Sequence, residues 1–293
     1  MITQERIPKV VYQLHIQSDT QEHLVLARAV LLSVGYEDKD LVTCVAQDKP
    51  SIELFDEQKT KLLQVEKLLS CLHLSGIHIH MRRLLPSDWL TRWKRQWKPA
   101  RLTKLLDVVP VWYKGRYKPK KSRDYILMDT LLSFGTGLHE TTQIMAQFIE
   151  DKQGAFSSLL DIGTGTGILG LVALKYGARY VCGIDIGELS IQAAGDNMKA
   201  NSLHFDIKRA DIKTFRSKKK FDFVAANLIT EDLITHAKKM ISFVKRGGFL
   251  AVSGISLDHL KRLRLAFSSL GLKTLKISKG KEWSGVLYQK TML

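Results

Sequence analysis

Long apolar runs and cysteines are both scarce in this chain of 293 residues. No apolar run reaches the roughly 18 residues that would indicate a transmembrane helix. Residues Met1 to Lys9 lack the apolar stretch of a secretory signal. The cysteines Cys44, Cys71 and Cys182 are widely spaced and form no C-x-x-C pair, which favours free thiols over disulfides. We therefore expect a cytoplasmic protein without a membrane partner.

Acidic residues are few relative to basic ones. The chain has 29 Asp and Glu against 45 Lys and Arg, a formal net charge of +16. Apolar residues make up 45% and charged residues 25%, which is typical of a globular protein and argues against disorder. Because the cations cluster along the sequence, they favour an anionic partner such as nucleic acid or a ribonucleoprotein. The alternative is that the charge only aids solubility.

The first 85 residues alternate between strand and helix patterns. The spacing of apolar residues predicts strands at 10–17, 41–46 and 77–84, and helices at 22–34 and 56–72. Strands and helices on one small sheet predict an α+β domain of the ferredoxin-like kind, over residues 1–85. His78 and His80 share a strand face, but no Cys or carboxylate lies nearby in the sequence, so no metal site is expected.

Residues 86–124 have a different composition, and we interpret them as a Trp-rich basic linker. Four tryptophans lie among many Lys and Arg: Trp89, Trp93, Trp97 and Trp112. The first three are four residues apart, which places them on one face of a helix. That face favours packing between two domains, while stacking on nucleotides remains the alternative.

From residue 125 to 293, strands and helices alternate regularly. Strands are predicted at 159–162, 180–186, 221–226 and 249–253, with an antiparallel pair at 275–279 and 283–290. Helices are predicted at 141–150, 168–176, 188–201, 233–243 and 256–270. This alternation predicts an α/β domain of the Rossmann-like kind, with a mostly parallel sheet covered on both faces.

A glycine loop directly follows the first of these parallel strands. The segment L-L-D-I-G-T-G-T-G ends with Gly163, Gly165 and Gly167 before a helix begins. Glycines allow a tight turn and a close backbone approach to a ligand, which in such sheets lies beyond the carboxyl ends of the strands. The spacing differs from G-x-G-x-x-G, which serves a pyrophosphate. The loop therefore favours an adenosine joined to a methionine moiety, as in S-adenosylmethionine, over a purely structural turn.

Polar residues end the next strands. Asp185 ends V-C-G-I-D-I, where a carboxylate can accept both ribose hydroxyls; a helix N-cap is the alternative. Asp211 ends a short expected strand and either holds the adenine amine or forms an ordinary turn. Asn227 follows the buried pattern F-D-F-V-A-A, where its amide would orient the cofactor's amino acid end or the target amine; a turn is the alternative.

The segment L-S-F-G-T-G-L-H-E-T-T precedes the first helix of this region. Its Thr hydroxyls and exposed helix-start N–H groups favour a carboxylate such as that of methionine. Phe134, Gly135 and Thr136 suggest an aromatic lid over the site. His139 is a candidate base, although packing within the loop explains it equally well.

Together these blocks resemble the PrmA family, whose members methylate the eleventh protein of the large ribosomal subunit. The resemblance is carried by S-F-G-T-G-L-H-E-T-T, D-I-G-T-G-T-G-I-L, G-I-D-I and A-N-L-I, and by W-K-R-Q-W-K-P before them. It implies a class I methyltransferase domain that uses S-adenosylmethionine, bound at Thr142, Gly163, Asp185 and Asn227. The chain departs from the family pattern at Ser133, Leu138 and Glu140, and in the order Leu228-Ile229.

The implied activity is methylation of lysine or N-terminal amines of a ribosomal protein, free or on the large subunit, with Asn227 placing the amine. The basic charge adds contact with ribosomal RNA as an expectation. Two alternatives are an RNA N-methyltransferase and a non-catalytic RNA-binding module. Adenine-directed enzymes usually place Asn-Pro-Pro and an aromatic residue after this strand, whereas Leu228, Ile229 and Thr230 follow Asn227 here.

Overall fold

The computed structural model describes residues 11–37, 40–46, 49–72, 74–84, 97–120, 122–129 and 137–292. The chain divides into two units, Met1–Trp97 and Lys98–Leu293. No helix within the described ranges combines the length and apolar character that a membrane crossing requires.

The first unit has one four-stranded sheet and two helices. Its elements are β1 (Val11–Ser18), α1 (Gln21–Ser33), β2 (Leu41–Ala46), β3 (Lys49–Asp56), α2 (Lys59–Cys71) and β4 (Ile77–Leu84). The strand order is β2-β3-β1-β4, and every pair of neighbours is antiparallel. This β–α–β–β–α–β connectivity is that of ferredoxin-like domains.

Strand β3 was not predicted, because Pro50 near its start argues against a central strand. Buried side chains nevertheless recur at every second residue, as they do in a strand. Ile52 and Leu54 are 3% and 0% exposed, and they pack in one core with Leu14, Ile16 and the buried faces of α1 and α2. The predicted helix start at Asp56 was also early, because the Asp56 carboxylate accepts a hydrogen bond from Gln58 N at 2.8 Å in the turn before α2.

The second unit is built on a seven-stranded sheet with the order β10-β9-β8-β11-β12-β14-β13. The strands are β8 (Ser158–Ile162), β9 (Tyr180–Asp185), β10 (Asp206–Arg209), β11 (Phe221–Asn227), β12 (Val244–Ser256), β13 (Leu272–Lys279) and β14 (Trp283–Lys290). The first five strands in this order run parallel, and β14 is antiparallel to both of its neighbours. The predicted parallel sheet and its closing antiparallel pair are therefore confirmed.

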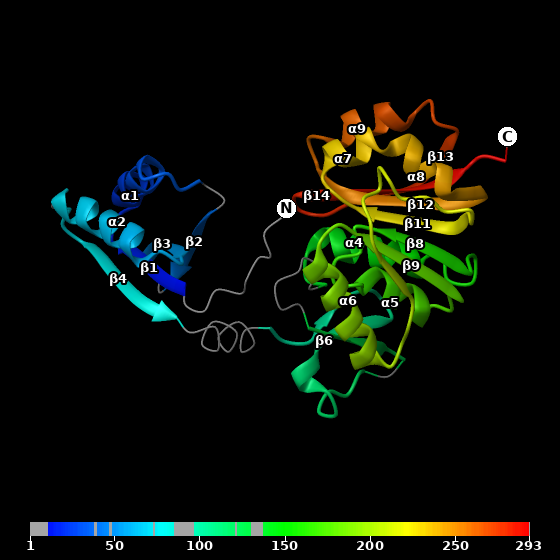
Figure 1. Cartoon of the computed structure of the whole chain (residues 1–293), viewed down its shortest axis with the longest axis horizontal. Helices are drawn as coiled ribbons and strands as arrows, with labels where there is room; N and C mark the ends of the chain where they lie inside the picture. The colour runs from blue at the N-terminus through cyan, green and yellow to red at the C-terminus, as the bar shows by residue number, and fades with distance from the viewer. Residues whose placement is uncertain are drawn as a thin grey trace. The chain divides into compact units, whose positions relative to one another are not determined.

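Helices cover both faces of this sheet. Figure 1 shows α4 (Glu140–Glu150), α5 (Ile168–Lys175) and α6 (Glu188–Asn201) on one face, and α7 (Thr230–Thr235), α8 (Ala237–Phe243) and α9 (Leu260–Phe267) on the other. The predicted helix 233–243 is two helices, α7 and α8, because the chain breaks at His236, whose φ is −101° and ψ 10°. The predicted helix 256–270 is shorter because β12 extends to Ser256.

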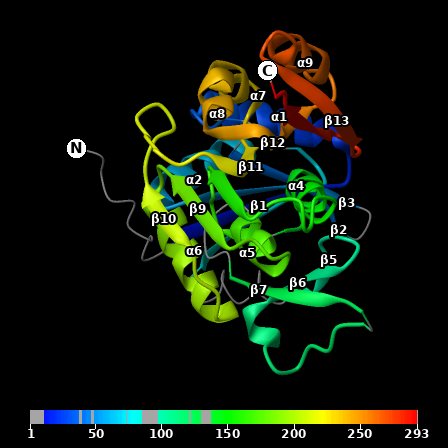
Figure 2. The same cartoon turned by 90° about the vertical axis from the view of Figure 1, so that its right-hand side faces the viewer.

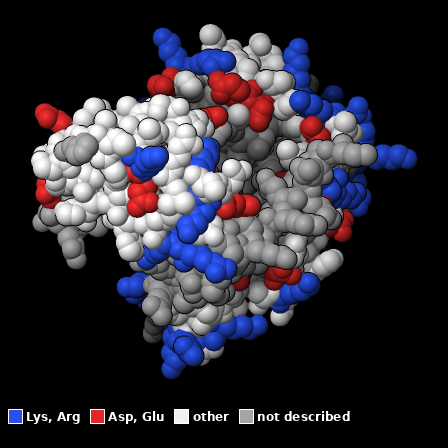
Figure 3. Space-filling model, turned by 60° about the vertical axis from the view of Figure 1, so that its left-hand side comes forward, with Lys and Arg blue, Asp and Glu red and all other residues white. Residues whose placement is uncertain are grey.

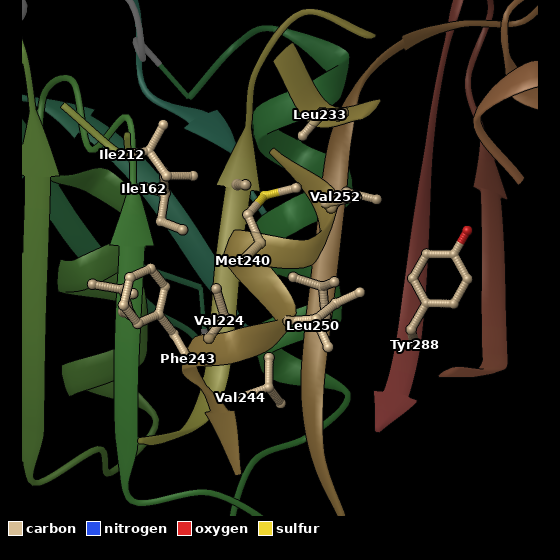
Figure 4. Packing of buried hydrophobic residues seen from close by; sticks show 14 of the residues in the cluster. Ile162, Ile212, Val224, Leu233, Met240, Phe243, Val244, Leu250, Val252 and Tyr288 are labelled. Carbon is tan, nitrogen blue, oxygen red and sulfur yellow. The ribbon is translucent and has the colours of Figure 1, made fainter. Parts of the chain in front are cut away.

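The core between the sheet and α8 is apolar and closely packed. In Figure 4, Met240 and Phe243 of α8 lie against Val224 of β11 and Leu250 of β12. All four side chains are 4% exposed or less. Burying side chains of this size stabilises the fold by roughly 1.5–3 kcal/mol each. This packing fixes β11 and β12, and so the residues that follow β11.

Residues 98–124, predicted as part of a linker, belong to the second unit. They contain β5 (Ala100–Arg101), β6 (Leu106–Pro110) and the 3-10 turn Val111–Tyr113, and β7 (Asp124–Met128) follows. These strands form a second sheet with the order β5-β6-β7 (Figure 2), and β7 contacts α5 and α6. Residues 86–96 of the predicted linker, with Trp89 and Trp93, lie outside the described residues, and Trp97 is 4% exposed.

A buried carboxylate joins this stretch to α4. Glu150 is 9% exposed and accepts hydrogen bonds from Thr103 Oγ1 at 2.5 Å, from Leu105 N at 3.0 Å and from the hydroxyl of Tyr176. Burial raises the pKa of Glu150, but the bonds from Thr103, Tyr176 and Gln147 outweigh it and lower the pKa overall. Sequence patterns do not reveal such a network, because its members are far apart in the chain.

Replacing Glu150 by Ala should destabilise the second unit by about 3 kcal/mol or more, because the Thr103, Leu105 and Tyr176 donors would lose their acceptor in a buried place. Urea unfolding followed by circular dichroism measures this change. The matched control Glu282→Ala removes an exposed carboxylate and should stay within about 0.5 kcal/mol of the parent. Equal stability of the two variants would show that the Glu150 network does not hold residues 98–110 in place.

Candidate active site

A cavity of about 630 Å³ opens at the carboxyl ends of the parallel strands. Strand β8 lies between β9 and β11, so the chain leaves β8 toward one side of the sheet and continues from β11 on the other. Ligands of doubly wound sheets bind at such a switch point. The cavity is lined by residues from several elements, among them Thr142, Gly163, Asp185, Asp211, Asn227 and Trp283.

The glycine loop after β8 needs glycine for two reasons. Gly163, Gly165 and Gly167 have φ values of 72°, 53° and 77°, in the left-handed region that side chains with a Cβ disfavour. Space is also short, because a Cβ on Gly163 would lie 2.7 Å from Leu228 Cδ2, and one on Gly167 would lie 3.0 Å from Ala194 Cβ. The loop therefore brings its backbone close to the cavity, as the motif predicts.

Asp185 stands at the end of β9 with its carboxylate fixed by two backbone amides. Its Oδ2 accepts from Gly165 N at 2.9 Å, and its Oδ1 accepts from Gly187 N at 2.9 Å. The N-cap of α6 is Gly187 without a side-chain cap bond, so the helix-capping alternative for Asp185 is wrong. Each carboxylate oxygen can accept more than one hydrogen bond, which leaves capacity for a vicinal diol in the cavity.

Thr142 presents a buried hydroxyl at the start of α4. The residue is 1% exposed and lines the cavity. Its Oγ1 has no hydrogen-bond partner among the described residues. Buried polar atoms are nearly always paired, so this hydroxyl, close to the first turn of a helix, fits a polar or anionic ligand group.

Asn227, Thr141 and His139 form a hydrogen-bonded chain across the cavity. Asn227 Nδ2 donates to Thr141 Oγ1 at 3.1 Å, and Thr141 Oγ1 lies 2.8 Å from His139 Nδ1. The His139 ring also packs on Trp283, with ring centroids 5.4 Å apart, and His139 is the N-cap of α4. These contacts give His139 a positioning role, and its role as a base stays a prediction.

The remaining predicted residues fall into two groups. Asp211 lines the cavity, but β10 ends earlier, at Arg209, and Asp211 Oδ1 accepts from Lys213 N at 2.8 Å in a turn. The turn is thus observed, and adenine binding by Asp211 stays a prediction. Phe134, Gly135 and Thr136, the predicted lid, lie outside the described residues.

Glu140, a departure from the family pattern, joins α4 to the turn between β13 and β14. Its carboxylate accepts from the backbone N–H groups of Lys281 at 2.8 Å, Glu282 at 3.1 Å and Trp283 at 3.3 Å. These bonds, with the first two the largest contributors, lower the pKa of Glu140. A Cβ on Gly280 would lie 2.5 Å from Glu140 Oε2, so a larger residue there would displace the Glu140 carboxylate. Glu140 thereby fixes Trp283 beside His139.

Sequence reasoning missed Asp161, although it stands inside the glycine motif. The residue is 1% exposed, and its Oδ2 accepts from Thr164 Oγ1 at 2.7 Å. Its Oδ1 has no partner among the described residues. Burial, with a smaller contribution from Asp185, raises the pKa of Asp161 to about 7. Trp283, Asp232 and His236 also line the cavity and carried no sequence signal, because α7 and β14 meet the site only through the fold.

The raised pKa of Asp161 predicts a pH-dependent stability in the ligand-free protein. Its pKa is about 7 in the folded state and about 4 in the unfolded chain, so between these values only the folded state holds the proton. Stability should therefore fall as the pH rises from about 4 to 7 and level off above, by at most about 4 kcal/mol.

Asp161→Asn should remove that dependence. Relative to the parent, the Asp161→Asn variant should be more stable at about pH 8 than at about pH 5. Urea unfolding at both pH values measures this difference. Parallel pH profiles of the parent and the variant would contradict the assigned pKa.

Comparison with known proteins gives a consistent picture. A family model described as ribosomal protein L11 methyltransferase (PrmA) matches residues 16–291. The ribosomal protein L11 methyltransferase of Caldanaerobacter subterraneus subsp. tengcongensis is 32% identical over 223 residues, which is 75% of this chain and 70% of that protein. The protein of the same name from Geobacter sulfurreducens is 29% identical over 260 residues, 87% of this chain and 84% of that protein.

A solved structure agrees. The crystal structure of a ribosomal protein L11 methylase from Lactobacillus delbrueckii subsp. bulgaricus has a TM-score of 0.62 and 27% identity, and it covers 67% of this chain and 100% of that chain. The predicted family and the predicted methyltransferase fold are confirmed, and S-adenosylmethionine as cofactor agrees with both. The chain belongs to the ribosomal protein L11 methyltransferase family.

Proposed function

We propose that this protein transfers methyl groups from S-adenosylmethionine to lysine or N-terminal amines of a large-subunit ribosomal protein, L11 in its relatives, either free or on the subunit. The observation that carries this proposal is one cavity that holds the fixed Asp185 carboxylate, the buried Thr142 hydroxyl, which has no partner among the described residues, and the Asn227 amide. Family membership supports the reaction and the substrate class.

The residues present fit the cofactor. Asp185 would accept the ribose hydroxyls, since Gly165 and Gly187 already fix its orientation. Thr142 and the start of α4 would hold the methionine carboxylate. Gly163 and Gly165 would leave room for the part of the cofactor between its ribose and its methionine carboxylate. Asp211 would hold the adenine amine. When bound, the cofactor supplies an electrophilic sulfonium methyl group.

Asn227 would orient the target amine. Because Asn227 Nδ2 donates to Thr141, the amide oxygen is the group left to accept a hydrogen bond from the amine. A lysine amine must be neutral to attack, and neutralising it at pH 7 costs about 4–5 kcal/mol at a pKa near 10.4. Burial in the cavity lowers that cost, because it disfavours the charged form. Asn227 would hold the neutral amine in line with the methyl group and its bond to sulfur. This proximity and orientation would supply the rest of the acceleration of methyl transfer.

Two substitutions separate cofactor binding from amine placement. Asp185→Ala should weaken binding of S-adenosylhomocysteine about 10- to 100-fold, because it removes a charged hydrogen-bond acceptor. Asn227→Ala should lower kcat about 100-fold, while the Kd of S-adenosylhomocysteine stays within about 5-fold. Calorimetry and methyl transfer from labelled S-adenosylmethionine to ribosomal fractions measure both effects. Asp196→Ala, an exposed acid on α6, is the control and should match the parent.

The location of the label tests the substrate class. Label in a large-subunit ribosomal protein supports the proposal. Label in RNA would establish an RNA N-methyltransferase instead, and no label with retained nucleoside binding would indicate a non-catalytic module. An Asn227→Ala variant with parental kcat would remove Asn227 from the mechanism.

A further inference from the structure

The two edges of the seven-stranded sheet differ in charge. At the edge with the cavity, three carboxylates line the cavity, from Asp185, Asp211 and Asp232, together with one lysine, Lys213. At the opposite edge, where the parallel strands begin, cations predominate among the described residues. We call this second surface the basic edge, and define it by Arg179, Lys218, Lys220, Arg246, Lys273 and Lys290.

Strand register brings these residues to one edge. Ser158 pairs with Tyr180, and Phe221 pairs with Val244, so β8, β9, β11 and β12 begin side by side. Leu272 pairs with Lys290, which adds the start of β13 and the end of β14 to the same row. Arg179 directly precedes β9, Lys218 and Lys220 precede β11, and Arg246 is near the start of β12. The cations come from segments that are far apart in the sequence, so no single segment displays this surface.

Part of the basic edge is fixed in place. Lys290 Nζ donates to Ile241 O and Val244 O, both at 3.0 Å, and Lys220 Nζ donates to Ser242 O. Both lysines thus sit at the C-terminal end of α8, where carbonyl groups favour cations. Burial, and then the like charges of Lys220 and Arg246, lower the pKa of Lys290. Lys220, Arg246 and Lys290 therefore lie close enough to repel one another.

Asp206 begins β10 and is exposed near this edge, whereas two other carboxylates close to it already have partners. In the described part of the chain, Asp222 is engaged by Lys245 Nζ at 2.6 Å and by the hydroxyls of Ser157 and Ser158, and Asp151 by Lys276 Nζ at 2.5 Å. Arg179, Lys218, Arg246 and Lys273 are exposed. On the side of the molecule that Figure 3 presents, Asp and Glu side chains lie among Lys and Arg side chains. Within the second unit, exposed cations therefore gather at the edge where the parallel strands begin.

We propose that the basic edge binds the phosphate backbone of double-stranded RNA. A row of exposed cations matches a row of phosphates, and the release of counterions drives such binding without base recognition. The cavity edge, with its carboxylates, repels the same polyanion. RNA would thus be bound at the edge of the sheet opposite the cavity, which leaves the cavity open to a cationic amine. This inference does not depend on methyl transfer.

Salt dependence of RNA binding tests the proposal. The full chain is titrated with a fluorescent RNA duplex of about 20 base pairs at several salt concentrations. Replacing Arg179, Lys218, Arg246 and Lys273 by Gln should reduce the slope of log K against log salt by about 3 to 4, and the affinity at about 0.1 M salt by about 100-fold or more. None of these four side chains has a role in the proposed active site.

A matched variant controls for net charge. Replacing Lys118, Lys120, Lys261 and Lys279 by Gln removes four exposed cations elsewhere in the second unit, so both variants have a formal charge of 16 − 4 = +12. The control should keep the parental slope within about 1 and the affinity within about 3-fold. Circular dichroism shows whether both variants are folded. A general loss of folding would not reduce the salt slope in the basic-edge variant alone.

Three outcomes would overturn the proposal. The two variants could lose RNA affinity equally, or the parent could fail to bind duplex RNA at about 0.1 M salt. The parent could also bind anionic phosphatidylserine vesicles instead of RNA. Methyl transfer to the free ribosomal protein is measured in parallel and should be unchanged in both variants. If the parent binds RNA but transfers no methyl group, only the proposed function is refuted. If the parent transfers methyl groups but does not bind RNA, only the proposal for the basic edge is refuted.

Discussion

The carboxylate of Asp185 is held by two backbone amides, and the rest of the site depends on that hold. Gly165 N can reach Asp185 only because the loop after β8 adopts left-handed conformations at its glycines. Those conformations place the loop against Leu228, directly after Asn227. The loop after β8 thus contacts the side chains of Asp185, which ends β9, and of Leu228, which follows β11. The cavity is a consequence of this junction, and its polar groups are oriented before any ligand arrives.

Sequence patterns predict this part of the molecule well, because each signal is local. The glycine spacing, the apolar run before Asp185 and the apolar run before Asn227 each specify one strand and the residue that ends it. Parallel strands then bring those ends to one edge without further information. Asp161 was present in the same motif and was overlooked. Its importance appears only when burial and the unpartnered Oδ1 are known.

Other features depend on contacts between distant parts of the chain. Glu150 meets Thr103 and Tyr176 only in the folded unit, so local patterns predict a linker at residues 98–124. Strand β3 was missed because Pro50 contradicts the local rule. Glu140 was recognised as unusual, but its three backbone partners belong to the turn before β14. The charge difference between the two sheet edges likewise follows from strand order and not from any one segment.

The proposed activity requires that the cavity beside Asp185 holds the nucleoside of S-adenosylmethionine. The most direct measurement is a crystal structure of the protein with S-adenosylhomocysteine. We expect both ribose hydroxyls to bind the Asp185 carboxylate and the amino acid carboxylate to bind Thr142 Oγ1. A nucleoside bound elsewhere, or bound in this cavity with Asp185 and Thr142 untouched, would contradict it.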